Sequence, residues 1–312
     1  MWYPKDLTIV GMGAGATITG PVLMGKGLFD IEGDNATIKN LTFTGAKASA
    51  GNGSGIRLDG TNLTVLNSRF TYNQDGILTG DNSLSTITIK NSTFDHNGAC
   101  VSACAHGVYV GHIAQLDVEN STFNATQKGH SIKSRALVTN ILNNKITDGP
   151  NGTSSYLIDV AKGGAITITG NTLEKGPKAS NAMYAISIGE EGPYLAQGPM
   201  LIANNTYQND RMKGVFVRNV SGYTGLVLSG NTLLGFTTTP LQGQGTITAN
   251  AANTLAAALI APLNTSADGF AATMQFAASD ATPSVPEEST LVLFATVLAG
   301  MMGLGRRRRR QS

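Results

Sequence analysis

The feature that most constrains this chain is a seven-residue phrase that recurs eight times between Thr37 and Leu233. In its general form it is a β-branched pair, an Asn or Gly-Asn, two small polar residues and a large apolar residue. The closing apolar residues recur at intervals of 23 to 34 residues, which is typical of stacked solenoid units. They are Phe43, Phe70, Phe94, Phe123, Ile146, Leu173, Tyr207 and Leu233.

A second alternating run lies between successive copies of the phrase, such as Gly55–Asp59 and Gly107–Gly111. At least two short strands per unit, with Gly, Asn, Asp and Ser at the corners and no helical spacing, predict an all-β parallel β-helix of about 8 to 10 coils. A leucine-rich repeat is the alternative, but the units lack its dense Leu spacing. The recurring Asn favours a ladder of amides that pair from coil to coil.

Composition agrees with thin coils rather than one thick core. Charged residues make up 13% of the chain and glycines number 38. The formal net charge of +2 includes five arginines at 306–310, so the rest of the chain is slightly acidic. We therefore expect no nucleic-acid partner.

The C-terminus combines the motif Val285-Pro286-Glu287, an uncharged apolar run at 291–305, and the arginines of 306–310. This tail resembles the PEP-CTERM sorting signal of Gram-negative bacteria. The resemblance implies export, anchoring by a short transmembrane helix, and cleavage by an exosortase-type enzyme. It departs from the family pattern at Glu288, where a second Pro is usual. An ordinary C-terminal membrane anchor is the alternative, and both readings predict a cell-envelope or extracellular protein.

These signals divide the chain into a β-helix domain at 1–249, an Ala-, Thr- and Asn-rich spacer at 250–284, and the sorting signal at 285–312. No basic and apolar leader precedes the first strand-like segment, so we expect the N-terminus to be internal to a longer reading frame. Cys100 and Cys104 share one loop, and in an oxidising compartment a disulfide is favoured over two free thiols.

Aligning the second strands coil on coil predicts one outward-facing column: Arg57, Leu78, Tyr109, Lys133, Asp159, Ser187 and Phe216. Small residues on either side predict a shallow trough for an extended polymer. Neighbouring coils are about 4.8 Å apart, so Tyr109, Lys133, Arg135 and Asp159 should fall within about 10 Å of one another.

The four histidines come from two coils: His96, His106, His112 and His130. Together with the trough and the mixed charges, they indicate a binding or catalytic site. The simpler alternative is structural. Lys133 and Asp159 would then form a cross-strand ion pair, while His106 and His130 would cap strands.

Residues 5–245 resemble bacterial pectin-lyase-like right-handed β-helix proteins. Within them, Gly129–Arg135 is similar to the Lys-bearing strand of alginate and chondroitin lyases of this fold. The resemblance implies a lyase or epimerase in which Lys133 is the base and Arg135 neutralises a uronate carboxylate. Tyr109 or His112 would be the proton donor, and His130 is a further catalytic candidate.

Five residues are the candidates for substrate binding: Arg57, His106, His112, Asp159 and Ser187. Some lyases of this fold use calcium, for which Asp159, Glu190 and Glu191 are weak candidate ligands. The expected partner is an extracellular acidic polysaccharide. The alternative function is a non-catalytic matrix, adhesion or carbohydrate-binding scaffold.

Overall fold

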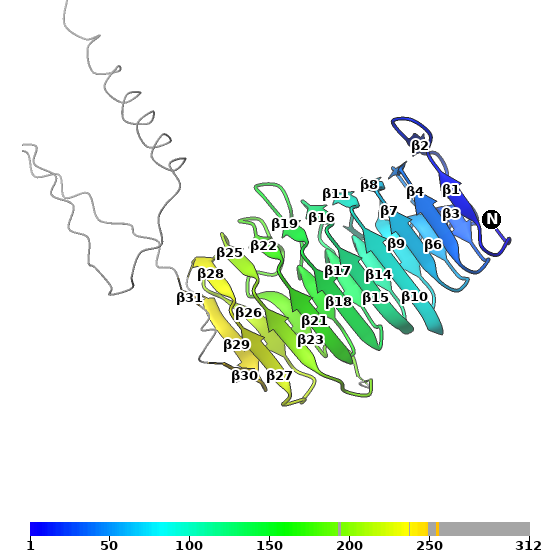
Figure 1. Ribbon diagram of the computed structural model, residues 1–312. Coiled ribbons are helices and arrows are strands. Elements are labelled where there is room, and N and C mark those ends of the chain that lie inside the picture. Colours follow the sequence, from blue (N-terminus) through cyan, green and yellow to red (C-terminus); the bar gives the residue numbers. More distant parts are fainter. Residues whose placement is uncertain (193–194, 237, 249–253, 256–312) are drawn as a thin grey trace, which may run out of the picture. The chain divides into compact units, whose positions relative to one another are not determined.

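The computed structural model describes residues 1–192, 195–236, 238–248 and 254–255. These residues form an all-β parallel solenoid of about nine turns, with three strands in each full turn, and Figure 1 shows successive coils stacked side by side. The predicted β-helix and its number of coils are therefore confirmed. The third strand was hidden in the sequence because the repeated phrase spans two strands and the corner between them.

The strands of successive coils line up in three parallel sheets. Sheet A contains β3 (Gly27–Ile31), β6 (Ser54–Leu58), β9 (Asp75–Thr79), β14 (Val108–Val110), β17 (Ile132–Ser134), β20 (Ile158–Val160), β23 (Tyr184–Ile188), β26 (Gly214–Asn219) and β29 (Thr238–Gly243). Sheet B contains β1 (Thr8–Val10), β4 (Ala36–Lys39), β7 (Leu63–Leu66), β10 (Asn82–Lys90), β15 (Ile113–Glu119), β18 (Val138–Leu142), β21 (Ala165–Thr169), β24 (Met200–Ala203), β27 (Leu226–Ser229) and β30 (Thr246–Ile247).

Sheet C contains β2 (Ala16–Ile18), β5 (Leu41–Thr44), β8 (Arg69–Thr71), β11 (Thr93–Asp95), β16 (Thr122–Asn124), β19 (Lys145–Thr147), β22 (Thr172–Lys175), β25 (Thr206–Asn209), β28 (Thr232–Gly235) and β31 (Thr254–Leu255). A separate antiparallel hairpin pairs β12 (Ala99–Cys100) with β13 (Cys104–Ala105).

The corner between sheets B and C explains the Asn or Gly of the phrase. Asn40, which separates β4 from β5, has φ 54°, and the equivalent Gly170 has φ 70°. A left-handed backbone is tolerated best by Gly and next best by Asn. The first corner residue is therefore selected for its backbone conformation.

The second corner residue points inward and forms a ladder, in which four members are Asn, as predicted, and three are Ser. Its side-chain oxygen accepts the N–H of the equivalent residue one coil earlier, at donor to acceptor distances from 2.8 to 3.3 Å. The residues are Ser68, Ser92, Ser121, Asn144, Asn171, Asn205 and Asn231, all buried. Each amide in the ladder satisfies backbone groups that the turn would otherwise leave without a partner.

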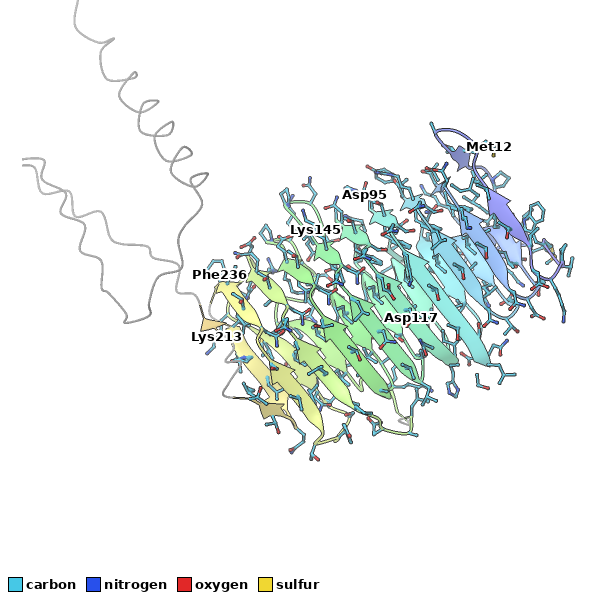
Figure 2. The ribbon with its side chains drawn as sticks, viewed as in Figure 1. Met12, Asp95, Asp117, Lys145, Lys213 and Phe236 are labelled. Atoms are coloured by element: carbon cyan, nitrogen blue, oxygen red, sulfur yellow. A yellow bond between two sulfur atoms is a disulfide. The ribbon has the colours of Figure 1, made fainter. Side chains whose placement is uncertain are left out.

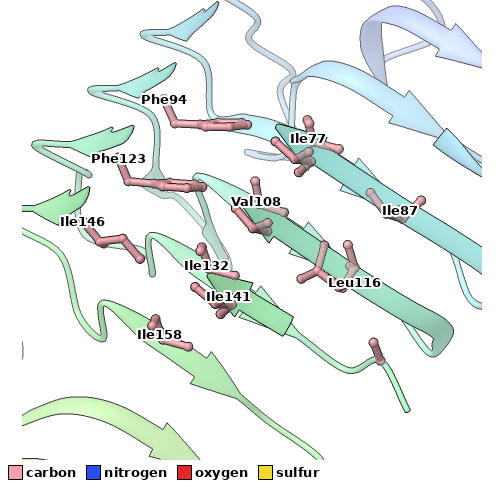
Figure 3. Close-up of a cluster of buried hydrophobic side chains, with 14 of the residues drawn as sticks. Ile77, Ile87, Phe94, Val108, Leu116, Phe123, Ile132, Ile141, Ile146 and Ile158 are labelled. Carbon is pink, nitrogen blue, oxygen red and sulfur yellow. The ribbon is translucent and has the colours of Figure 1, made fainter. Parts of the chain in front are cut away.

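The core is a column of large apolar side chains that the phrase contributes from sheet C. The rings of Phe43, Phe70, Phe94 and Phe123 stack with neighbouring centroids 5.0, 4.8 and 4.5 Å apart. Figure 3 shows Phe94 and Phe123 stacked, with Ile146 continuing the column. Burying one such aromatic side chain stabilises the fold by about 2 kcal/mol or more.

Glycines near the start of several sheet A strands face this aromatic column: Gly76 is the second residue of β9, and Gly107 directly precedes β14. A Cβ on Gly76 would lie 2.8 Å from Cδ1 of Phe94, and one on Gly107 would lie 3.3 Å from Cδ1 of Phe123. These glycines were expected to flank an outward trough. That expectation was wrong, because these two glycines pack against Phe rings of sheet C.

No helix in the described region of the chain is long and apolar enough to cross a membrane. The segments assigned to the spacer after 255, the Val285-Pro286-Glu287 motif, the apolar run 291–305 and the arginine tail lie outside the described residues.

We expect Asn171→Ala to lower the free energy of unfolding by about 2 to 3 kcal/mol. The substitution removes the hydrogen bonds of the partner groups, which are buried and cannot bond to water instead. The Asn171 amide donates to the Ile141 carbonyl and Asn205 Oδ1, and its Oδ1 accepts from the Asn144 backbone. Denaturant titration measures the change.

The matched control is Asn143→Gly. Asn143 is exposed with φ 55°, a conformation that Gly adopts freely, so stability should change by less than about 0.5 kcal/mol. Equal losses in the two variants would contradict the assignment of the ladder to the second corner residue.

Candidate functional site

The outward column of sheet A is aligned as predicted over most of its length. Backbone pairing places Tyr109 beside Lys133, Lys133 beside Asp159, and Asp159 beside Ser187. Arg57 and Leu78 extend the column on the N-terminal side. Side chains from separate coils therefore meet on one face.

The next coil departs from the prediction. Ser187 pairs with Arg218, whereas Phe216 is completely buried and stacks on Tyr207 with ring centroids 5.2 Å apart. Phe216 and Val217 are adjacent and both lie in the core, so Phe216 occupies the same inward position as Gly76 and Gly107 in earlier coils, which simple strand alternation does not predict. The apolar ring takes the interior place, and the column continues with a guanidinium.

Tyr109 lies beneath two cations. The Lys133 ammonium is 5.3 Å and the Arg135 guanidinium 5.1 Å from the centre of its ring. Burial raises the pKa of Tyr109, although Arg135 opposes the shift. The hydroxyl is therefore a neutral proton donor near two positive groups.

The Glu191 carboxylate bridges those two cations. The chain leaves β23 at Gly189, which has φ 84°, and the Glu191 backbone N–H donates to the Ala161 carbonyl at 2.8 Å. Its Oε1 is 2.7 Å from Lys133 Nζ, and its Oε2 is 2.6 Å from Arg135 Nε. Burial works against ionisation, but the hydrogen bonds from Arg135 and Lys133 outweigh it and lower the pKa of Glu191 to about 2. Sequence reasoning noted this residue only as a weak metal ligand.

Glu190 makes equivalent contacts with side chains nearer the C-terminal end of the column. It forms an ion pair with Arg218 and accepts hydrogen bonds from Ser187 Oγ at 2.5 Å and Tyr156 hydroxyl at 3.3 Å. The two adjacent glutamates thus cover two neighbouring stretches of the column, and Ser187 is engaged by one of them.

Asp159 lies between these groups and is 2% exposed. Its Oδ2 is 3.6 Å from His130 Nε2 and 3.9 Å from Lys133 Nζ, while Oδ1 has no hydrogen-bond partner among the described residues. Burial raises the pKa of Asp159 to about 7, although the charge of Lys133 opposes the shift. This carboxyl therefore changes charge near neutral pH.

His106 and His130 align as predicted, with ring centroids 4.7 Å apart, and Tyr156 extends the stack at 4.9 Å. His106 Nδ1 accepts the His130 backbone N–H, and His130 Nδ1 accepts that of Tyr156. Both neutral rings must then carry their proton on Nε2. Burial lowers the pKa of His130 to about 3 and that of His106 well below its usual value. His106 and His130 thus accept backbone N–H groups of neighbouring coils, which is the structural role given above as the alternative to a binding or catalytic role.

The remaining histidines lie apart from this cluster. His112 is exposed at the corner after β14, where its backbone N–H donates to Asp81 Oδ1 at 2.7 Å. His96 stacks on Tyr72 beside sheet C, with ring centroids 5.0 Å apart. No contact of the His112 ring with Tyr109 or Lys133 is found in the described region of the chain, so its predicted roles lack support from position.

A disulfide joins Cys100 to Cys104 and closes the β12–β13 hairpin. Cys104 borders two cavities, one of about 270 Å³ that also contains Arg57, Tyr109 and Arg135, and one of about 530 Å³ that contains His130. The hairpin therefore lies at the edge of two cavities beside the predicted trough. Arg57 itself is paired with Asp59 at 2.6 Å.

The weak metal candidates are already engaged by cations, since Glu190 contacts Arg218 and Glu191 contacts Lys133 and Arg135. Among the described residues, the carboxylates of Asp30, Glu32 and Asp59 also lie within 4.8 Å of one another. Lys26 Nζ lies 3.9, 3.4 and 2.7 Å from these three side chains and offsets their charge.

Two overlapping segments of the chain, residues 15–104 and 85–260, match a family model described as a right handed beta helix region. No curated protein and no solved structure matches the chain.

The raised pKa of Asp159 predicts a pH-dependent stability. Its folded pKa of about 7 lies above the ordinary value of 3.8, so the folded state holds the proton more tightly and wild-type stability falls as pH rises between these values. Between about pH 5 and about pH 8, Asp159→Asn should gain on the order of 2 kcal/mol relative to wild type. Denaturant titrations at both pH values measure this, and a difference independent of pH would contradict the assignment.

Proposed function

The chain belongs to the family of right-handed β-helix proteins, and we propose that the outward face of sheet A binds an acidic polysaccharide. The carboxylates of the polysaccharide make the contact. The observation that carries the proposal is that Lys133 and Arg135 both form an ion pair with one carboxylate, that of Glu191. The proposed chemistry at this place is uronate β-elimination or epimerisation.

Lys133 and Arg135 form a carboxylate seat, a name used here for these two side chains. Charge-assisted hydrogen bonds from Lys and Arg are the strong ones, and a guanidinium fits a planar carboxylate well. In the proposal a uronate group takes the place of Glu191, and Tyr109 lies below the sugar ring. Aromatic rings beside the seat also offer an apolar surface for the sugar.

Elimination needs three events at this place. Arg135 holds the carboxylate, which acidifies the hydrogen on the adjacent carbon; Lys133 removes that proton; and the Tyr109 hydroxyl donates a proton to the leaving glycosidic oxygen. The carbon–hydrogen and carbon–oxygen bonds break, and a carbon–carbon double bond forms. In the proposed reaction the uronate carboxylate stays on Arg135, and Lys133 must be in its neutral form to accept the proton.

A non-catalytic binding protein is the second candidate. The observation that favours it is that Arg57, Lys133, Arg135 and Arg218 are all paired with carboxylates. Binding by exchange of one carboxylate for another needs no free base. Such a protein would serve as a matrix, adhesion or glycan-binding scaffold.

Location outside the cytoplasm belongs to the proposal as well. Disulfides persist in oxidising compartments, which supports export, and the C-terminal motif supports processing by an exosortase-type enzyme at the membrane. In fractionated cells we expect the protein in the envelope or medium with Cys100 and Cys104 oxidised. A cytoplasmic protein with both thiols free would contradict this.

Assay of the purified chain against a panel of uronate polymers tests the enzymatic reading. Wild type should release unsaturated product that absorbs ultraviolet light, and Lys133→Ala should reduce this by about a hundredfold or more. Lys145→Ala is the control, because Lys145 lies on the outward side of β19 in sheet C (Figure 2). Binding without any product in wild type would favour the scaffold instead.

Glu191→Gln should bind uronate oligomers more tightly by roughly tenfold, because the neutral amide competes less well for the carboxylate seat. Calorimetric titration measures the affinity. Glu119→Gln, which removes a similar charge from sheet B, controls for net charge. If both variants gain equally, Glu191 is not a competitor for the ligand.

A further inference from the structure

The larger cavity beside the disulfide hairpin has a chemistry different from that of the carboxylate seat. Its volume is about 530 Å³, and it is bordered by the chain segments that lead into β17, β20 and β23 in three successive coils. The hairpin closes one side through Cys100 and Cys104. His130 forms another wall, beyond which lies Asp159.

The charge of this cavity is positive. Lys128 and Lys178 both line it, and none of its lining residues carries a carboxylate. Among the described residues, Lys178 Nζ donates only to the neutral amide of Asn151, at 3.3 Å, and the Lys128 ammonium has no hydrogen bond or ion pair. Lys133 and Arg135, in contrast, both form an ion pair with Glu191.

Hydroxyl groups complete the lining. Thr153, Ser155 and Ser180 contribute them from two neighbouring turns. The buried Lys175 lies behind, where its ammonium donates to the Ser155 carbonyl, and Asp148 is its countercharge. Two ammonium groups and three hydroxyls provide several donors in different directions around one space.

This donor set fits a tetrahedral oxyanion. Lysine acts as a point charge without the planar fork of Arg, and a sulfate or phosphate ester presents three oxygens that Lys and hydroxyl donors can reach from separate sides. The seat at Lys133 and Arg135 has an Arg fork and already holds a planar carboxylate. The larger cavity and the carboxylate seat therefore differ in the anion that they suit.

We propose that the cavity of Lys128 and Lys178 is a subsite for a sulfate or phosphate ester. This subsite rests on the proposed function and specifies its substrate. The polysaccharide carries a sulfate or phosphate ester as well as uronate carboxylates. The ester and the carboxylate bind on opposite sides of the Cys100–Cys104 hairpin.

Calorimetric titration of the full chain at low ionic strength tests the subsite with inorganic sulfate, inorganic phosphate and acetate. Wild type should bind sulfate or phosphate at least about tenfold more tightly than acetate, and the preferred one indicates which ester the subsite takes. The double variant Lys128→Gln, Lys178→Gln should lose this binding by about tenfold or more.

The control is Lys145→Gln combined with Lys39→Gln, which removes the same charge from sheets B and C. Equal weakening in both double variants, acetate binding as tight as that of sulfate and phosphate, or no binding of either anion to wild type would overturn the subsite.

Separate polymer titrations distinguish this proposal from the proposed function. If sulfate or phosphate binds at Lys128 and Lys178 while no uronate polymer binds, the subsite stands and the proposed function fails. If an unsubstituted uronate polymer binds and depends on Arg135, while its sulfated or phosphorylated counterpart binds no better, the proposed function stands and the subsite fails.

Discussion

The structure depends on the register between coils, which is held by the inward ladder at the corner of sheets B and C. Each ladder residue, from Ser68 to Asn231, bonds to its neighbour in the adjacent coil, and the Phe column stacks with the same repeat. A one-residue slip of a strand would exchange its inward and outward faces. Because the ladder prevents such slips, Tyr109, Lys133 and Asp159 of three different coils share one surface.

Surroundings, rather than residue type, determine how the carboxyl groups of this surface behave. Glu191 accepts hydrogen bonds from two cations and has a pKa of about 2, whereas buried Asp159 has a pKa of about 7. The first is an ionised group that fills the carboxylate seat, and the second gains or loses a proton near neutral pH. In the proposed function a ligand carboxylate replaces Glu191, and the charge of Asp159 modulates the attraction of that ligand to the site.

Much of the fold could be predicted from the spacing of the repeated phrase, but three features depend on contacts between distant parts of the chain. The inward direction of Gly76 and Gly107 depends on Phe rings that come from another sheet. The replacement of Phe216 by Arg218 in the outward column could not be predicted, because Phe216 and Val217 both lie in the core and so depart from strand alternation. The position of Glu191, which lies 58 residues from Lys133 in sequence, depends on the path of the chain after β23.

The central claim is that Lys133 and Arg135 form a seat for a ligand carboxylate that Glu191 fills in the free protein. A crystal structure of the chain with a bound uronate oligosaccharide tests it most directly. The account predicts the sugar carboxylate on Lys133 and Arg135, the ring over Tyr109, and Glu191 displaced. A sugar bound on another face, with Glu191 still bridging the two cations, would contradict it.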